Sequence, residues 1–391
     1  MLRITDILLA PPGPANPLSV GLTIGGQEPA PAGRPLVFWG DLEADVLDAP
    51  EAARLVDLIK PVLAQQPATS FRALAERVRR AITAPDAAPS AHLVLIAALE
   101  ETLLAAVAHA QDLTPAALLA VEYGFVPGDR SPSLSLLLEI SDYDATAERI
   151  DRMLALRPAG IGYRLTAGER VAEAIGENGE HLQRFVRELR QRADAIGSPF
   201  SIYLGLNGAL GRLAGDPLRH IGKVLAHCVG LQNAAGTHQL ILEEPFLLDD
   251  PLAQLANLHR LNDFLRLTPD SLKRSRPTLL VARAQPLPAE LQMYADIAAA
   301  HALIFEPHTS SMESMLVGIK RCRAANIGSF LTLRAAESPR RATTIINMAW
   351  AAGAAGLLIT YDGHNDGLLS LAARRLAELS TPFNLLGVEA G

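Results

Sequence analysis

Short hydrophobic runs alternate with amphipathic segments from about residue 133 to the C-terminus. Eight of the runs are nearly continuous in apolar residues, which is typical of strands that are buried on both faces. We expect these strands at 134–140, 160–166, 200–207, 239–245, 278–284, 302–308, 328–335 and 356–362. The segments between them have helical periodicity and are long enough for right-handed crossovers. The pattern therefore predicts an α/β fold with a C-terminal (β/α)8 barrel of the TIM type over residues 126–391.

The first 125 residues have a different pattern. Three strand-like runs, at 2–10, 18–26 and 35–42, are separated by turn-forming segments rich in proline and glycine. Helical patterns follow at about 50–65, 69–83 and 89–110, and the third is apolar on most faces, so we expect it to be buried. Strands followed by helices indicate an α+β capping domain over residues 1–125.

Composition narrows the class of protein. Apolar residues make up 49% of the 391 residues and charged residues 20%, which is typical of a globular protein. The net charge of −7 argues against a nucleic-acid partner. The N-terminus lacks a signal-peptide pattern, and we see no uncharged run long enough to cross a membrane. The two cysteines, Cys228 and Cys322, have no metal-ligand spacing. We expect a cytoplasmic protein that binds neither nucleic acid nor a membrane.

Several collinear segments resemble one known family. They lie at 140–156, 176–211, 240–245, 301–343 and 365–379. In order and spacing they resemble the enolase superfamily, and most closely methylaspartate ammonia-lyase. The resemblance implies a capping domain ahead of the barrel and a homodimer. It also implies removal of a proton next to a carboxylate, with the resulting enolate stabilised on Mg²⁺ by three acids at the ends of the third, fourth and fifth strands.

The family's metal ligands are only partly present in this sequence. The acid of the third strand aligns with Gly205, with Asn207 as the nearest polar residue, and that of the fifth strand aligns with Arg283. Only the fourth strand keeps an acid, Glu243. One carboxylate beside an arginine does not make an all-oxygen site for a divalent cation. The family's lysine base aligns with Phe305. We therefore expect no metal and no other cofactor.

Polar residues remain at many strand ends, and in a barrel these ends converge on one face. Arginines are prominent among them, and a guanidinium suits carboxylate or phosphate ligands because it has five donors and keeps its proton. We expect the following residues to bind substrate: Arg164, Arg334, Glu139, Asn207, Glu306 and Asp362. A one-residue slip in register would turn Arg164 or Arg334 from the lumen to the helix layer.

Four residues are candidates for catalysis. Arg283, positioned by Glu243, is expected to stand in for the lost metal, or else the two form a closed structural ion pair. His308 and His364 are candidate acid–base groups because an imidazole titrates near neutral pH, or else they are loop histidines with one backbone hydrogen bond. Three tyrosines are expected to pack in the core with a tethered hydroxyl: Tyr163, Tyr203 and Tyr361.

Three functions remain open from the sequence. The first is a diverged, metal-independent lyase or isomerase that acts on a small anionic carboxylate substrate. The second is a catalytically silent member that binds a small acid or, as a scaffolding subunit, a partner protein. The third is a C–N lyase like methylaspartate ammonia-lyase with an atypical Mg²⁺ site built from Glu243, Glu244 and Asp362. Convergent arginines favour the first function, and a collapsed lumen with a closed Glu243–Arg283 pair favours the second.

Overall fold

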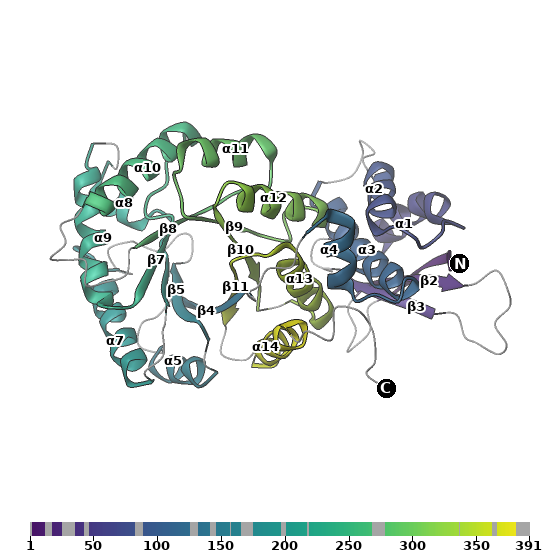
Figure 1. Cartoon of the computed structure of the whole chain (residues 1–391), viewed down its shortest axis with the longest axis horizontal. Coiled ribbons are helices and arrows are strands. Elements are labelled where there is room, and N and C mark those ends of the chain that lie inside the picture. Colours follow the sequence, from purple (N-terminus) through teal and green to yellow (C-terminus); the bar gives the residue numbers. More distant parts are fainter. Residues whose placement is uncertain are drawn as a thin grey trace.

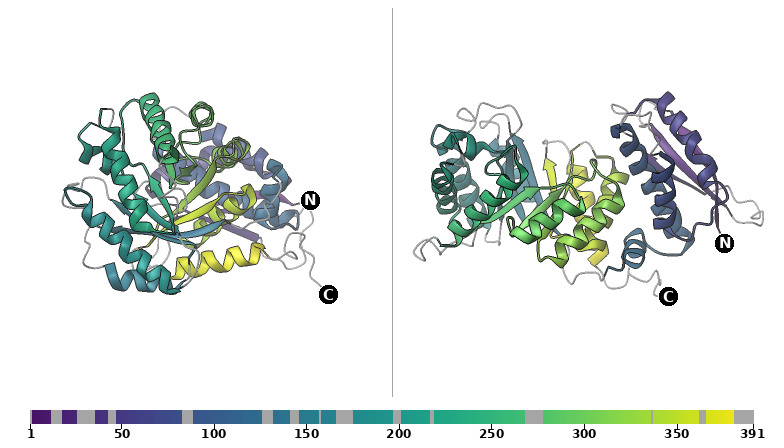
Figure 2. Two further views of the ribbon diagram at one scale, coloured as in Figure 1. Left: turned by 60° about the vertical axis from the view of Figure 1, so that its left-hand side comes forward. Right: turned by 90° about the horizontal axis from the view of Figure 1, so that it is seen from above.

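The structure is a computed structural model of the whole chain. It describes residues 2–11, 18–25, 36–42, 47–82, 89–125, 132–140, 146–156, 158–165, 175–196, 201–216, 219–267, 278–335, 337–361 and 366–380. A barrel and a smaller domain beside it are visible in Figure 1. The right-hand view of Figure 2 shows that the N-terminal strands and helices lie at one end of the molecule, to one side of the barrel.

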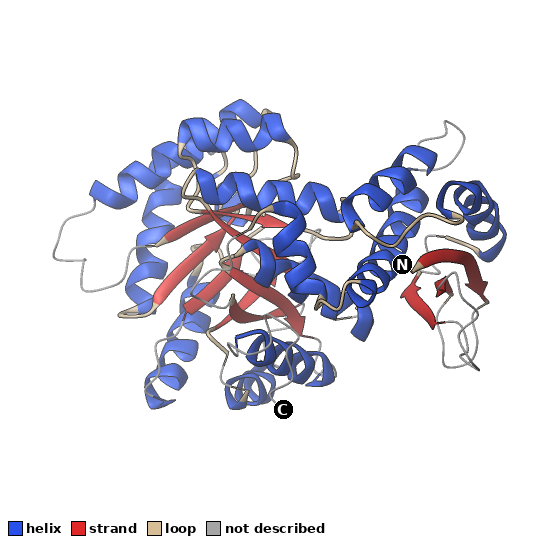
Figure 3. Ribbon diagram, turned by 45° about the vertical axis from the view of Figure 1, so that its right-hand side comes forward, coloured by secondary structure: helices blue, strands red, loops and turns tan. Residues whose placement is uncertain are grey.

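Eight parallel strands form a closed barrel in the described part of the chain, and helices surround them (Figure 3). Around the barrel the order is β10, β11, β4, β5, β6, β7, β8, β9. The strands are β4 (Ser133–Ile140), β5 (Gly160–Leu165), β6 (Ser201–Gly205), β7 (Gln239–Glu243), β8 (Leu279–Arg283), β9 (Ala302–Phe305), β10 (Gly328–Leu333) and β11 (Gly356–Tyr361). Each strand pairs in parallel with its neighbours, so all carboxyl ends lie on one face.

Helices connect successive strands on the outside of the barrel. They are α5 (Thr146–Ala155), α7 (Glu180–Ile196), α8 (Ala209–Ala214), α9 (Ile221–Ala235), α10 (Pro251–Leu267), α11 (Pro288–Ile297), α12 (Met312–Ala324), α13 (Pro339–Ala352) and α14 (Asp366–Ser380). Two of them begin at a serine N-cap: Ser311 accepts a hydrogen bond from the Ser314 N–H, and Ser338 accepts one from the Arg341 N–H. These caps fix where the chain turns from the barrel face into α12 and α13.

The barrel interior is filled by side chains rather than open. Its core contains Tyr203, Ile241, Val281, Ala302, Ile304, Phe330 and Leu358. A much larger apolar core lies between the strands and the surrounding helices and continues into the N-terminal domain. The strands are thus buried on both faces, which is why their sequences are almost uninterrupted in apolar residues.

The N-terminal domain packs helices on a small antiparallel sheet. Its strands, in the order β1, β2, β3, are β1 (Arg3–Ala10), β2 (Ser19–Gly25) and β3 (Leu36–Asp41). Its helices are α1 (Ala49–Leu63), α2 (Phe71–Ile82), α3 (Pro89–Ala110) and α4 (Pro115–Tyr123). By length and composition the stretch His92–Ala110 of α3 could cross a membrane, but 67% of it is buried inside the protein, as in the core helix of a globular domain.

The predicted fold class, a (β/α)8 barrel preceded by an α+β cap, is confirmed. Several strands end earlier than predicted. The largest difference is in β9, which ends at Phe305 instead of residue 308. The chain turns there, because the backbone N–H and the hydroxyl of Thr309 both donate to the Glu306 carbonyl, at 3.0 and 2.9 Å. The domain boundary at residues 125 and 126 stays a prediction, and α4 packs against both α3 and α13.

Candidate functional site

Strand register brings three sequence-distant positions to one level at the carboxyl end of the barrel. Arg164 of β5 pairs with Gly205 of β6, which pairs with Glu243 of β7. Tyr203, Ile241 and Val281 face the barrel core. They lie two positions before Gly205, Glu243 and Arg283 on β6, β7 and β8. Because side chains alternate between the two faces of a strand, Glu243 and Arg283 also point to the barrel axis. The inward direction predicted for Arg164 and Arg283 follows from this register.

Glu243 is the centre of the site. Its carboxylate is 1% exposed and accepts three hydrogen bonds. Arg283 Nε donates to Oε1 at 2.5 Å, while Arg164 Nη2 and the Tyr203 hydroxyl donate to Oε2 at 3.2 and 2.6 Å. Burial alone would raise the pKa of Glu243, but the charges of Arg164 and Arg283 outweigh it and hold the pKa below its usual value. Glu243 therefore stays ionised although water does not reach it.

A second layer of polar residues lies nearer the solvent. Arg283 Nη1 donates to Glu306 Oε1 at 2.6 Å, and the other oxygen of Glu306 lies 3.2 Å from His308 Nε2. The hydrogen bond from His308 and the charge of Arg283 lower the pKa of Glu306 to about 2. The Arg283 side chain is 36% exposed, so this layer is open to water. Arg283 thus joins the buried carboxylate to a surface carboxylate–imidazole pair.

Glu244 has an unusual environment beside this network. Burial, and then the charge of Glu243, raise the pKa of Glu244 to about 7. Its backbone φ is +48°, and that of Asn207 at the end of the neighbouring strand is +45°. Hydrogen bonds between the two strand ends hold these conformations: the Leu206 N–H donates to the Glu243 carbonyl and the Gly208 N–H to the Glu244 carbonyl. Left-handed backbone at non-glycine residues costs free energy and is concentrated at functional sites.

A divalent cation does not fit this set of residues. A β-carbon at Gly205 would lie 2.9 Å from Arg164 Cγ and 3.0 Å from Glu243 Oε2, so the arginine side chain fills the space into which an acid on the third strand would project. Glu243 is the one acid of the family's metal-binding pattern that this chain keeps, and the guanidinium groups of Arg164 and Arg283 both donate to it. Within the described ranges, no group of three or more His, Cys, Asp or Glu side chains is arranged to hold a metal ion.

The structure brings together five of the sequence-predicted site residues: Arg164, Glu243, Arg283, Glu306 and His308. Arg334 does not take part in their hydrogen bonds and ion pairs as far as the chain is described; it follows the last residue of β10 and its side chain is exposed. Glu139 pairs in register with Arg164. Asn207 is partly buried at the end of β6. Asp362 and His364 lie outside the described residues.

Sequence reasoning did not connect Tyr203 to the site. It is fully buried, and the group that tethers its hydroxyl is Glu243 itself. Strand parity was the signal that could have found it, because Tyr203 lies two residues before Gly205 on the same face of β6. Glu244 was expected only as a ligand of an atypical Mg²⁺ site, and its raised pKa was not readable from the sequence because it depends on burial among residues of neighbouring strands.

The barrel matches one family by sequence. Residues 140–369, which are more than half of the chain, match the family model of the methylaspartate ammonia-lyase C-terminus. A comparison with curated proteins finds no match.

Solved structures of the same family are similar over almost the whole chain. The Mg complex of β-methylaspartase from Clostridium tetanomorphum is 17% identical, with a TM-score of 0.73 over 96% of this chain and 98% of that one. Methylaspartate ammonia lyase from Citrobacter amalonaticus, containing (2S,3S)-3-methylaspartic acid, is also 17% identical, with a TM-score of 0.75 over 97% and 98%. A dipeptide epimerase from Enterococcus faecalis is 12% identical, with a TM-score of 0.60 over 91% and 89%. At these identities the likeness shows the fold.

Proposed function

The chain belongs to the methylaspartate ammonia-lyase family within the enolase superfamily, and on this premise we propose that it is a metal-independent lyase or isomerase that acts on a small carboxylate substrate. The observation that carries the proposal is the position of Arg283. A permanent cation lies at the end of the fifth barrel strand, bonded to Glu243 at 2.5 Å and to Glu306 at 2.6 Å. The family pattern places a metal-binding acid at this position.

Arg283 has the chemistry to bind and stabilise an anion. Its Nε and Nη1 atoms are engaged by the two glutamates, and its side chain is 36% exposed. A guanidinium binds carboxylates in a planar geometry and does not lose its proton near neutral pH. A preorganised cation at the place where negative charge develops lowers the energy of an enolate-like transition state. Glu243 holds the guanidinium in place from the buried side.

His308 is the proposed acid–base group. Its Nε2 lies 3.2 Å from Glu306, and a carboxylate partner of this kind orients an imidazole. In the proposed reaction His308 removes the proton next to the substrate carboxylate, and the C–H electron pair becomes the enolate that Arg283 stabilises. The enolate then expels a leaving group from the neighbouring carbon, or it takes up a proton from solvent on the opposite face of the same carbon. The first outcome is a lyase reaction and the second an isomerisation.

Binding without turnover is the second candidate function, and one observation favours it. The buried part of the network is closed, because Glu243 already accepts bonds from Arg164, Tyr203 and Arg283. Such a cluster also suits a protein that only holds a small acid. The two functions differ in a measurable way, since only the enzyme exchanges the carbon-bound proton of its ligand with solvent.

The experiment has two stages. Thermal-shift and calorimetric titrations with a panel of di- and tricarboxylates identify a ligand, and NMR in D₂O then follows exchange of its proton next to the carboxylate. We expect Arg283→Ala to abolish binding and His308→Gln to abolish exchange while binding is retained. Arg374→Ala, which removes a 71% exposed arginine on α14, is the control for loss of charge. Binding without exchange supports the silent binder, and no binding of any carboxylate contradicts both functions.

A further inference from the structure

The segment that carries Glu306 and His308 is held from the capping domain. The residues from 306 to 312, here called the β9–α12 segment, connect the end of β9 with the start of α12. Two adjacent glutamates of the capping helix α3, Glu100 and Glu101, contact the two ends of this segment, one directly and one through Arg341. Helix α3 is otherwise almost entirely apolar over Leu93–Ala108. Its two buried charges therefore need specific partners.

Glu100 holds the C-terminal end of the segment. Its Oε2 accepts a hydrogen bond from the Met312 N–H at 2.7 Å, which is the first N–H of helix α12. Its Oε1 accepts one from Arg79 Nη1 at 2.7 Å, and the side chain is 1% exposed. A carboxylate at a helix N-terminus satisfies a free donor and interacts favourably with the helix dipole. The start of α12 is thereby fixed to the capping domain.

Arg341 holds the other end. This residue lies in the first turn of α13, and its guanidinium makes two bonds in two directions. Nη1 donates to Glu101 Oε1 at 2.9 Å, and Nη2 donates to the carbonyl of Pro307 at 2.9 Å. Pro307 stands between Glu306 and His308, so the carbonyl that Arg341 holds belongs to the turn that places the carboxylate–imidazole pair. Arg341 and Glu101 are 15% and 3% exposed.

We propose that Arg341 is a positioning residue for His308, and that Glu100 and Glu101 make the capping domain part of the site by fixing the segment that carries it. The part of this inference that concerns catalysis rests on the proposed function; the part that concerns the segment does not. Sub-ångström placement of a proton-transfer group changes rates strongly, which gives the contact a functional consequence.

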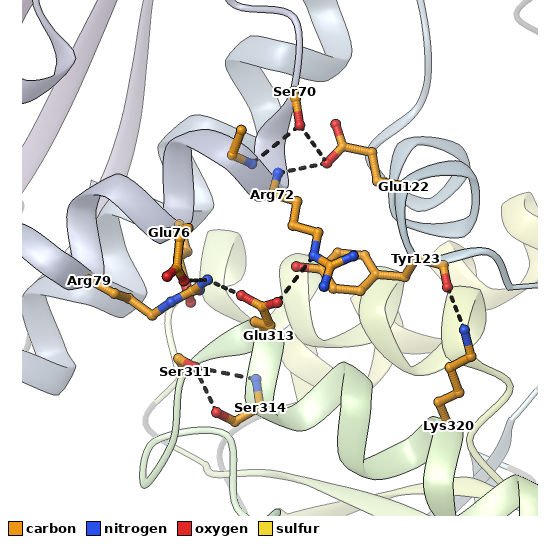
Figure 4. Close-up of polar contacts among 12 residues, drawn as sticks. Ser70, Arg72, Glu76, Arg79, Glu122, Tyr123, Ser311, Glu313, Ser314 and Lys320 are labelled. Carbon is orange, nitrogen blue, oxygen red and sulfur yellow. Dashed lines mark hydrogen bonds and ion pairs between the residues drawn. The ribbon is translucent and has the colours of Figure 1, made fainter.

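Other contacts between the capping domain and α12 lie beyond the segment. Figure 4 shows Glu313 of α12 between Arg72 and Arg79 of α2, and Lys320 with the carbonyl of Tyr123. These contacts attach the helix, whereas Arg341 contacts the turn itself. The neighbouring residue Arg340 supplies a matched control. It also binds a capping-domain carboxylate, that of Asp41 at 2.9 Å, and this partner does not lie in the β9–α12 segment.

The first test needs no substrate. Amide hydrogen exchange of peptides covering 306–316, and the imidazole NMR resonance of His308, are compared between the wild type and four variants: Arg341→Ala, Arg341→Lys, Glu101→Gln and Arg340→Ala. We expect Arg341→Ala to speed exchange in the segment by about tenfold or more and to shift the His308 resonance. Arg340→Ala is expected to leave both unchanged. Arg341→Lys keeps the charge but cannot span Glu101 and Pro307, so it too should loosen the segment.

The second test uses exchange of the substrate's carbon-bound proton. Arg341→Lys is expected to lower kcat by about tenfold while KM changes little. If the wild type shows no such exchange, the proposed function fails while the first test still decides the positioning role. A folded Arg341→Lys protein with wild-type amide exchange and a wild-type His308 resonance overturns the inference, and so does an equal effect of Arg340→Ala.

Discussion

Two buried clusters of acids and arginines behave differently in this protein. In the barrel, Glu243 has two guanidinium partners and a tyrosine hydroxyl, and its pKa is held below the usual value. At the domain interface, Glu101 has one guanidinium partner, Arg341, and burial raises its pKa to about 7. Both carboxylates are at most 3% exposed. Because the two carboxylates are buried to a similar extent, the difference between their pKa values follows from their cationic partners, two for Glu243 and one for Glu101.

The clusters also differ in their access to water. The interface cluster lies between the capping domain and the barrel, with Glu100 and Arg341 at most 15% exposed. The barrel cluster reaches the surface through Arg283, which is 36% exposed. An ion pair that is buried on all sides can only stabilise or specify the fold. Where the arginine of a pair is accessible to solvent, a ligand carboxylate can replace one of its glutamate partners. This difference is the physical basis for placing the substrate at Arg283.

The largest expected effect comes from removing the central carboxylate of the barrel cluster. Glu243→Ala leaves the guanidinium of Arg164, which is 11% exposed, and that of Arg283 facing each other without their shared partner. Breaking a buried ion pair from one side costs about 3–5 kcal/mol of unfolding free energy. Urea unfolding measures this loss. Glu378→Ala on α14, whose carboxylate is 44% exposed, is the comparison for an ordinary surface pair, and equal losses for the two variants would contradict the role given to Glu243.

The next effect is a pH dependence that belongs to the interface cluster. Glu101 has a pKa of about 7 in the folded protein, compared with the ordinary pKa of 4.5 in an unfolded chain. Between these values the folded state binds more protons, so the unfolding free energy falls as pH rises from 4.5 to 7 and levels off above. The difference corresponds to about 3 kcal/mol.

Denaturant unfolding at several pH values tests this sign. Glu101→Gln removes the titrating group and should flatten the decline between pH 4.5 and 7. Glu148→Gln, which changes an 89% exposed carboxylate on α5, should leave the decline unchanged. A wild type whose unfolding free energy rises over this range, relative to Glu101→Gln, would show that Arg341 keeps Glu101 ionised and that the two clusters are alike.

A smaller effect is expected from adding one methyl group to the barrel cluster. Gly205→Ala brings a β-carbon to 2.9 Å from Arg164 Cγ and 3.0 Å from Glu243 Oε2. Overpacking of this kind costs about 1–3 kcal/mol. A double-mutant cycle with Arg164→Ala should show that the two substitutions are coupled, since truncation of the arginine removes the shortest contact, that with Arg164 Cγ. Gly222→Ala in α9 has no neighbour within 4 Å and should not be destabilising; additive effects in the cycle would count against Arg164 as the group that fills this space.

The smallest effect is expected at the exposed edge of the domain interface. Arg340 pairs with Asp41 at 2.9 Å, and its side chain is 54% exposed. Exposed pairs contribute less than about 1 kcal/mol and weaken with salt. Arg340→Ala should therefore change the midpoint of thermal unfolding far less than Arg341→Ala does. Similar changes for the two variants would mean that burial does not distinguish these neighbouring arginines.

The fold was predictable because of one physical constraint. Strands covered by helices on one side and filled by a core on the other must be apolar throughout, and this gave all eight barrel strands. The ends of the strands were less predictable. Residues Glu306–His308 continue the strand pattern in sequence, but the hydrogen bonds of Thr309 to Glu306 turn the chain after Phe305. Turn geometry of this kind depends on neighbours that periodicity does not report.

The site was predictable where strand parity fixed it. Arg164, Glu243 and Arg283 point inward because each continues the inward alternation of its strand. The same alternation predicts that the side chain of Arg334 points inward, but Arg334 lies after the end of β10 and is exposed. The role of Glu101 was not readable, because its partner Arg341 follows 240 residues later in the sequence. Only tertiary structure brings such residues together.

A titration with Mg²⁺ tests most directly whether the guanidinium groups have replaced the metal of this family. Isothermal titration calorimetry of the purified protein, with Glu243→Gln as the comparison, measures binding at this position. We predict no saturable Mg²⁺ binding at millimolar concentrations, because Arg164 and Arg283 occupy the carboxylate that a divalent cation would need. One Mg²⁺ bound tightly per chain, and lost in Glu243→Gln, would contradict this prediction.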